Sequence, residues 1–334
     1  MKKSLSLGKL SVTIIGGGLA LALLVVALLL LPFLTTRSSI IGLVILTLLY
    51  AVMGEAWNIL GGYTGQVSLG NAVYFGVGAY TCTVLLLRWN LNPWLGMLIG
   101  GALAILCGLI IGVPTFRLKG HYFVTASIVI NEVVRVLFTN WDLVGGARGL
   151  YVPIQEESFL TFQFHSSKIP YYYIILALFL LVVLVTRLVE RGKWGFYFRA
   201  IRDDPEAAAS LGVNVTRYKH VANAINAFFT ALAGTFYAQY VLFLDPASVF
   251  SISISVLVLL LPVLGGKGTL WGPILGAFVL IPLSEVTRIY LGGQGRALHL
   301  VIYGLLIMII AVVEPRGLMA LVGRLTPRRF RRRG

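Results

Sequence analysis

The sequence predicts an all-α polytopic membrane protein with about ten transmembrane helices. Hydrophobic residues make up 58% of its 334 residues, charged residues only 12%, and the mean hydropathy is +0.90. A soluble domain carries about 25% charged residues. The apolar residues also gather into runs of the length that crosses a bilayer, about 17–25 residues. We therefore interpret the whole chain, 1–334, as a single transmembrane domain.

Ten apolar runs reach the length of a membrane span. The first follows three lysines and exceeds the apolar core of a signal peptide, about 7–15 residues, so we expect a retained helix. The third and the eighth are the weakest, because one is rich in glycine and polar residues and the other is short and rich in serine. The runs lie at 12–34, 39–60, 67–87, 93–113, 121–140, 170–189, 220–243, 247–264, 271–291 and 297–313.

The placement of lysine and arginine orients these spans. Basic residues concentrate in the cytoplasmic segments of membrane proteins. With both termini in the cytoplasm, 20 of the 27 Lys and Arg residues fall in cytoplasmic segments and 6 in external ones. This topology predicts a cytoplasmic loop at 191–219 and a basic cytoplasmic tail at 314–334. Ten spans would also allow two inverted five-helix halves, an arrangement that recurs in transporters.

Composition argues against several classes of function. The net charge of +15 does not indicate nucleic acid, because the basic residues lie in loops and in the tail rather than along a helix face. Cys82 and Cys107 both fall inside apolar runs, which favours neither a disulfide nor a metal site. The four histidines are scattered without ligand spacing. We expect no metal, no organic cofactor and no catalytic residue in this chain.

A charged segment, 202–219, separates two long apolar blocks. Asp204 suits the N-cap of a helix, Pro205 its first position, and Glu206 the positive end of the helix dipole. Three alanines continue the helix, and Gly212 favours its end. The sequence therefore predicts a short, capped helix with an almost flat face. Either it lies in a groove of a soluble partner, or it is a solvated helix between two spans.

The uncharged segment 61–71 is too polar and too rich in glycine for a regular helix. Non-helical backbone at membrane depth is tolerated only where it is buried in protein or lines a wet cavity. One interpretation is that its polar side chains line a pathway and contact a zwitterionic or amide-like solute. The alternative is an ordinary tight loop between two spans. The side chains concerned are Thr64, Gln66, Ser68 and Asn71.

Small residues recur at every fourth position of the fourth span. Such a ladder lets two helix backbones approach closely in a membrane. A shorter ladder recurs at the start of the ninth span. We interpret both as packing devices. The positions are Gly96, Gly100, Ala104, Gly108 and Gly112, and then Gly268, Gly272 and Gly276.

Few charged residues lie within the spans. Glu132 and Arg135, and likewise Glu285 and Arg288, are spaced i, i+3, so each pair can meet on one helix. A lone charge at mid-membrane costs about 2.5–3.5 kcal/mol, which makes structural pairing the simplest interpretation. The functional alternative places both pairs at the external mouth or against an external binding protein. Glu55 has no such neighbour.

Several motifs occur in a fixed order between about 40 and 320. They are GYTGQVSLGNAVYFGVGAY, RLKGHYFVTASIVINEVVR, NWDLVGGARGL, FRAIRDDPEAAASLGVNVTRYK, GGKGTLWGPILGA and EPRGL. Together they closely resemble the LivM-type permease of branched-chain amino acid ABC importers. The resemblance implies a multi-pass subunit of a bacterial inner membrane. It also implies as partners a homologous LivH-like permease, two cytoplasmic ATP-binding subunits and an extracytoplasmic solute-binding protein.

By similarity, the charged helix is the element that docks on an ATPase. The residues concerned are Asp204, Pro205, Glu206, Ala207, Ala208 and Gly212. Two features depart from the resemblance. The family commonly has a histidine at the position of Asn71. The full importer coupling motif continues after Gly212 to an Ile-x-Leu-Pro, and this chain has HVANAINA instead.

The sequence leaves three functions to weigh. The chain has no phosphate-binding loop, since the segment around Lys267 lacks the first glycine and the hydroxyl of that motif. ATP must therefore be bound by partner subunits. The leading hypothesis is a permease for branched-chain or other small amino acids, and members of the same family for urea, short amides or aromatic acids are the first alternative. A stand-alone secondary transporter would need a buried titratable residue, for which only Glu55 is a candidate.

Overall fold

The computed structural model describes residues 23–35, 37–118, 120–291, 304–305, 308 and 317–319. Within these ranges eight helical segments are long and apolar enough to cross a membrane, and a shorter apolar helix covers Leu23–Leu34. The segments are Ser38–Asn58 (α2) with its π-helical extension Ile59–Tyr63 (η1), Asn71–Trp89 (α3), Pro93–Thr115 (α4), His121–Thr139 (α5), Ile169–Arg191 (α6), Val215–Val241 (α9), Pro246–Val249 (α10) leading into Ile252–Gly265 (α11), and Trp271–Leu291 (α12).

These helices confirm the all-α polytopic prediction and eight of its ten spans. The third span begins at Asn71 rather than at 67, because the glycine-rich residues before it are not helical. The first run is described only from residue 23, so its N-terminal half lies outside the described residues. The tenth run, 297–313, and the tail, 314–334, also lie mostly outside them.

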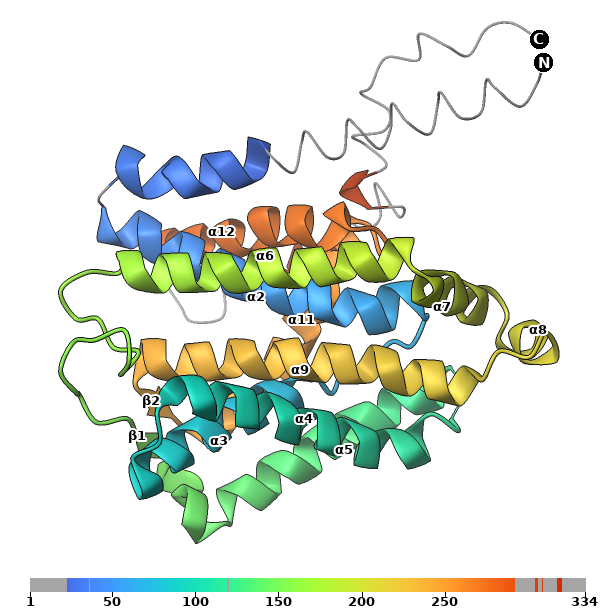
Figure 1. The fold of residues 1–334 in the computed structure, drawn as a ribbon, viewed down its shortest axis with the longest axis horizontal. Helices are drawn as coiled ribbons and strands as arrows, with labels where there is room; N and C mark the ends of the chain where they lie inside the picture. Colours follow the sequence, from blue (N-terminus) through green and yellow to red (C-terminus); the bar gives the residue numbers. More distant parts are fainter. Residues whose placement is uncertain are drawn as a thin grey trace, which may run out of the picture.

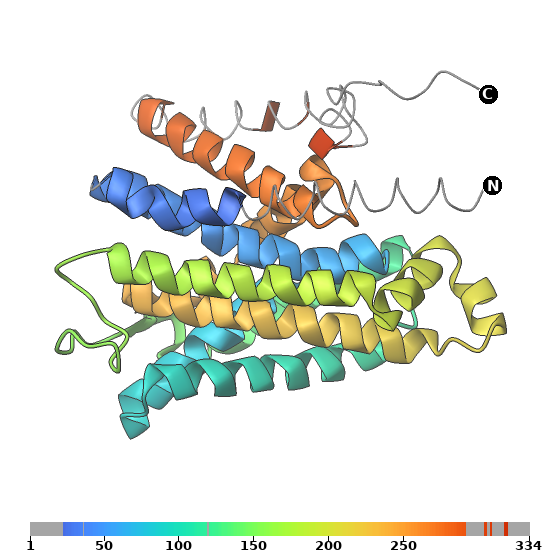
Figure 2. The ribbon, with the colours of Figure 1, turned by 45° about the horizontal axis from the view of Figure 1, so that its top comes forward.

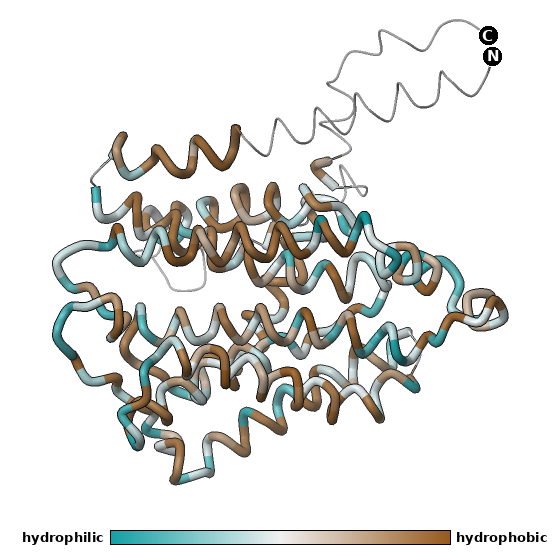
Figure 3. The backbone as a smooth tube through the Cα atoms, viewed as in Figure 1, coloured by the Kyte–Doolittle hydropathy of each residue, from teal (hydrophilic) through white to brown (hydrophobic). Residues whose placement is uncertain are grey.

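The spans run side by side, and their connections gather at two opposite ends (Figures 1 and 2). At one end, here called the α8 end, the helices Lys193–Asp203 (α7) and Pro205–Ser210 (α8) project beyond the bundle. At the other, the β1 end, Leu150–Tyr151 (β1) pairs antiparallel with Phe243–Leu244 (β2), with Leu150 opposite Leu244. Hydrophilic residues lie mainly toward both ends of the bundle, while its middle is largely hydrophobic (Figure 3).

Glycine ladders bring α3, α4 and α9 into close contact, as the sequence predicted for α4. Gly100 lies against Gly78 of α3, where an added Cβ would approach the Gly78 carbonyl oxygen to 3.2 Å. A Cβ at Gly78 itself would overlap the carbonyl of Ala231 on α9. Thr235 of α9 donates its hydroxyl to the Gly78 carbonyl at 3.0 Å. The small residues thus replace side-chain interdigitation by backbone contact.

The helices α2, α11 and α12 form a second group, packed in the same way as α9, α3 and α4. α11 and α12 pack on each other through Gly276, where a Cβ would overlap the Leu261 carbonyl. α2 packs against this pair, whereas α9 packs against α3 and α4. The second span therefore rests on the eighth and ninth, and the seventh on the third and fourth.

Candidate coupling site

The predicted capped helix is present as α8, at the tip of the α8 end (Figure 1). The Asp204 carboxylate accepts hydrogen bonds from the backbone N–H groups of Glu206 at 2.9 Å and Ala207 at 3.0 Å, and Pro205 takes the first helical position. Gly212 has a φ of +86°, which a residue with a Cβ seldom adopts. The helix is therefore fixed at both ends by residues that its sequence supplies.

The C-terminal end of α8 is closed by a pair of backbone hydrogen bonds. The N–H of Val213 donates to the carbonyl of Ala208 at 3.1 Å, and the N–H of Gly212 donates to that of Ala209 at 2.9 Å. This is the Schellman pattern, in which a glycine reverses the chain and satisfies the last carbonyls. Asn214 then caps α9 by accepting from the N–H of Arg217 at 3.0 Å. The turn between the two helices is thus as well determined as the helices themselves.

The two faces of α8 differ in a way that the sequence does not reveal. Ala208 is only 3% exposed and faces the protein itself, although it belongs to the predicted contact helix. Its neighbours Pro205, Glu206, Ala207 and Ala209 are exposed. Leu211, which the sequence did not single out, is 86% exposed. It lies outside the spans found in the described residues, so lipid would not cover this apolar side chain. The outward face of α8 therefore carries a free apolar side chain at its end.

Aromatic packing joins α7 and α9, the two helices that flank α8 in the chain. Tyr197 of α7 packs on Tyr218 of α9 with ring centroids 4.6 Å apart, and Phe198 meets the same ring at 6.4 Å. Phe198 is fully buried. α7 follows α6 directly and α9 is itself a span, so α8 lies between two segments that are each continuous with, or part of, a membrane-length helix.

Arg202, at the end of α7, joins α8 to a third part of the chain. Its guanidinium lies 3.4 Å from the carbonyl oxygen of Gly62 in η1 and pairs with Asp203 at 3.2 Å. A Cβ at Gly65 would contact the Arg202 side chain at 3.0 Å. The same guanidinium adjoins Gly268, in the turn between α11 and α12. One arginine therefore contacts both glycine-rich turns of this end of the molecule.

Asn58 fastens those two turns to each other. Its side-chain carbonyl accepts from the N–H of Gly268 at 2.8 Å, and its amide donates to the Thr269 carbonyl at 2.9 Å. A Cβ at Gly62 would collide with the Asn58 side chain, which explains a glycine in η1. π-Helical turns are rare and are frequently found at functional sites.

The backbone of the segment 61–71 leaves the α-helix, as predicted, but most of its polar side chains point inward. Thr64 donates to the carbonyl of Leu60, and both Thr64 and Ser68 are buried. The Ser68 carbonyl accepts from the indole of Trp57 at 2.8 Å. Gln66 alone of the four predicted pathway residues is partly exposed. In this conformation the segment therefore resembles the packed loop of the alternative interpretation.

Asn71 begins α3 and is fully buried in a pair with Asn226 of α9. Each amide donates to the other's carbonyl oxygen, at 3.1 and 2.9 Å. One turn earlier on α9, Asn223 donates to Tyr74 at 2.9 Å and to the Gly108 carbonyl at 3.0 Å. The only sequence signal for these partners is the pair of asparagines three residues apart in an apolar span.

The two predicted intramembrane ion pairs both form, and they lie away from α8. Glu132 and Arg135 pair on α5, and Arg288 donates to Glu285 on α12 at 2.7 Å. Glu55 is fully buried in α2, and within the described residues its carboxyl oxygens have no hydrogen-bond partner. These groups do not form one cluster with α8.

The connection between α5 and α6 forms a structured loop at the β1 end. Glu157 accepts from the hydroxyl and N–H of Ser166 and from the N–H of His165. The Ser166 hydroxyl, together with these backbone groups, holds the pKa of Glu157 below its usual value. This fixed loop exposes several large apolar side chains to solvent, namely Tyr151, Ile154, Phe159 and Leu160.

Comparison with known proteins places these features in a family. A family model described as the permease component of the branched-chain amino acid transport system matches residues 38–311. The high-affinity branched-chain amino acid transport system permease protein LivM of Escherichia coli (strain K12) is 29% identical over 310 residues, covering 86% of this chain and 71% of that protein. The probable branched-chain amino acid transport permease protein LivM of Methanocaldococcus jannaschii is 22% identical over 322 residues, covering 84% and 92%.

A relative with another named solute is also similar. The fructose import permease protein FrcC of Rhizobium meliloti is 28% identical over 244 residues, covering 68% of this chain and 64% of that protein. No solved structure matches the chain.

Proposed function

We propose that this chain, which belongs to the family of permease components of branched-chain amino acid transport systems, is one membrane subunit of an ATP-driven importer in a bacterial inner membrane. Its solute would be a branched-chain or other small amino acid. The observation that carries the proposal is α8, a capped helix that is exposed at one end of the bundle and joined through Arg202 to the turns of other spans.

The proposed mechanism is mechanical. An ATP-binding subunit receives the outward face of α8, where Leu211 supplies an apolar contact. Closure of the ATP-binding subunits moves α7 and α8 together, since Tyr197 and Tyr218 pack them against α9. Arg202 passes the displacement to the turn at Gly62, and the rigid spans convert it into alternating access. ATP itself is bound by the partners, and this chain needs no cofactor of its own.

The remaining partners follow from the two ends of the molecule. We assign the α8 end to the cytoplasm, in agreement with the distribution of lysine and arginine. The β1 end would then meet the solute-binding protein through the exposed apolar side chains of the loop between α5 and α6. A homologous LivH-like permease would complete the membrane unit.

We also propose the finer topology of ten spans in two inverted halves with both termini in the cytoplasm. The support is the reciprocal packing of α2 on α11 and α12, and of α9 on α3 and α4. A two-fold relation between halves of opposite orientation exchanges these two contacts. In this assignment the Glu285–Arg288 pair on α12 has a structural role, as i, i+3 pairing on one helix suggests.

The identity of the solute is a separate question. The likeness to a fructose permease favours keeping other small polar solutes as the alternative, along with urea, short amides and aromatic acids. A stand-alone secondary transporter is the rival of another class, because Glu55 is a fully buried acid. That rival requires transport by this polypeptide alone.

Reconstitution into proteoliposomes tests the proposal. The chain is combined with a second permease, ATP-binding subunits and a binding protein from the same organism, and uptake of labelled leucine, fructose and urea is measured. We expect leucine uptake only with ATP inside and with all subunits present. Uptake by this chain alone, driven by an ion gradient without ATP, would instead establish the rival.

A further inference from the structure

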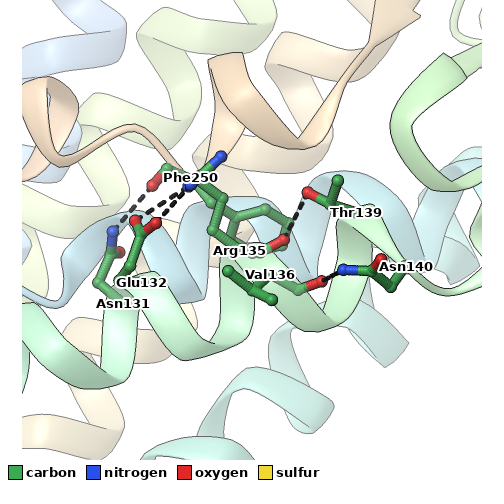
Figure 4. A network of polar contacts seen from close by, with 7 residues as sticks. All are labelled: Asn131, Glu132, Arg135, Val136, Thr139, Asn140 and Phe250. Carbon is green, nitrogen blue, oxygen red and sulfur yellow. Dashed lines mark hydrogen bonds and ion pairs between the residues drawn. The ribbon is translucent and has the colours of Figure 1, made fainter.

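Helix α5 is the least covered of the described spans. Only 17% of its apolar window is buried, against 39–72% in the other seven. Its inner face, with Phe123, Ser127 and Asn131, packs on the bundle, and Asn131 donates to the carbonyl of Phe250 at 2.8 Å (Figure 4). Val134 and Phe138 also pack against the bundle, and the side chains on the other faces of the helix are exposed or half-buried along its length.

The outward part of α5 divides into two stripes of different chemistry. One is apolar, as expected for a lipid contact or a helix interface. Its members are Tyr122, Val129, Val133 and Leu137, all at least half exposed. The other, here called the polar stripe, advances by four and three residues in turn, which keeps its members on one helix face. It consists of His121, Thr125, Ile128, Glu132, Arg135 and Thr139, and all of these are exposed or half-buried.

The polar stripe extends through the membrane. From His121 to Thr139 a helix rises about 27 Å, close to the hydrocarbon thickness of about 30 Å. Thr125 and Thr139 donate their hydroxyls to the carbonyls of His121 and Arg135, at 3.1 and 2.8 Å. Their lone pairs remain available to accept hydrogen bonds. A polar group facing lipid along such a length would be costly, so this stripe should face water or protein.

The ion pair lies within this stripe rather than against the bundle. Arg135 donates to Glu132 at 2.9 Å, and the two side chains retain 34% and 55% exposure. Figure 4 shows the two side chains turned toward each other. Both charges can therefore be reached by a solute that passes along the helix.

We propose that the polar stripe is one wall of the solute path, closed on its far side by the second permease subunit, and that Glu132 and Arg135 bind the ammonium and carboxylate of a zwitterionic α-amino acid. This inference rests on the proposed function and specifies its substrate class. When the solute binds, the ion pair between Glu132 and Arg135 is replaced by two ion pairs, one between each side chain and the solute. Neither charge is therefore left without a partner. Ile128, one turn from Glu132, offers an apolar contact to the amino acid side chain. A sugar or urea has no charges to match this pair.

Accessibility to charged thiol reagents tests the wall independently of transport. Single cysteines are placed at Thr125 or Thr139 in the polar stripe and at Val129 or Val133 in the apolar stripe, after Cys107, the partly exposed native thiol, has been changed to Ala. In the assembled importer we expect the first two to react with charged methanethiosulfonates and the last two to be protected. Equal protection of both stripes would overturn the water-lined wall.

Uptake by charge-neutral variants tests the binding of the zwitterion. E132Q and R135Q should each lower leucine uptake about ten-fold while assembly is retained, since a hydrogen bond to a charged group is lost. The matched control is the structural pair on α12, where E285Q and R288Q should change uptake less than two-fold, that is by under about 0.4 kcal/mol.

The double variant E132Q/R135Q separates binding from a structural role. If the ion pair is merely structural, removing both charges should restore uptake, because no lone charge remains in the membrane. A pair that binds solute loses both contacts, so the double variant should transport at most as well as either single variant. Recovery of wild-type uptake in E132Q/R135Q would overturn the proposal. If the wild-type assembly does not use ATP, the proposed function is contradicted instead. The result of the thiol test does not depend on that outcome.

Discussion

At the scale of single residues, Arg202 has more consequences than its place in a charged loop suggests. Its guanidinium contacts the Gly62 carbonyl in η1 and adjoins Gly268 in the turn before α12. Asn58 holds those two turns together. A side chain placed between three segments can transmit a displacement from one to the others, provided that each contact persists during the movement.

Replacing Arg202 by alanine tests this link. The exposed end of α8 is unchanged in R202A, so ATP-binding subunits should still associate and hydrolyse ATP. The ratio of ATP hydrolysed to leucine transported should rise about five-fold, a modest loss of coupling energy. Parallel assays of phosphate release and uptake in proteoliposomes measure that ratio.

The control for R202A is R217A, another exposed arginine on the same charged segment, 202–219. It should retain the wild-type ratio, because Arg217 lies on the first turn of α9 and enters the cap through its backbone N–H. An unchanged ratio in R202A would remove Arg202 from the mechanism.

At the scale of elements, α8 combines a rigid attachment with a free face. The Asp204 cap and the Gly212 turn fix the helix, and buried Ala208 seats it on the chain. Leu211 projects at the end of the exposed face. Ala208 is thus better suited to holding α8 in place than to touching a partner.

Leu211 should contribute directly to binding of the ATP-binding subunits. Burial of a leucine side chain is worth about 1.5–3 kcal/mol, so L211D should weaken their binding about ten- to a hundred-fold. Co-purification and binding by surface plasmon resonance measure the loss. I154D, at another highly exposed position, on the β1 end, should leave that affinity unchanged and impair only the response to the binding protein. Equal effects of both variants would argue against a docking role for α8.

The contact of α3 with α9 sets a limit on substitution inside the membrane. A side chain at Gly78 overlaps the Ala231 carbonyl, and helix backbone cannot yield as a side chain can. G78V should destabilise the protein by about 1–3 kcal/mol or more, as overpacking does. Thermal unfolding in detergent measures the change. I110V, on the exposed side of α4, should be nearly neutral, and a G78V variant with wild-type stability would refute the close contact.

Local chemistry made α8 predictable, since a cap, a first-turn proline and a terminal glycine act within one segment. The same holds for the α4 ladder and for the pairs spaced i, i+3. The contacts of Arg202 with Gly62, and of Asn71 with Asn226, join residues more than a hundred positions apart, and no local pattern encodes them. The exposure of Leu211 and the burial of Ala208 likewise depend on how α8 is seated.

At the scale of the whole molecule, the two ends of the bundle carry different surfaces. The α8 end has a projecting helix linked by Arg202 to the turns of α2, α11 and α12. The β1 end has a fixed loop with exposed apolar side chains. Between them, α5 leaves a polar stripe uncovered. Each surface would be incomplete in a protein that acted alone, and each corresponds to one proposed partner of the importer.

Photo-cross-linking from position 211 tests the central claim most directly. A benzoylphenylalanine replaces Leu211 in the assembled importer, and the adducts are identified by mass spectrometry with and without nucleotide. We expect a covalent adduct with an ATP-binding subunit, whereas the same probe at Ile154 should yield none with that subunit. The absence of any adduct with an ATP-binding subunit from position 211, in an assembly that hydrolyses ATP and transports, would contradict the account.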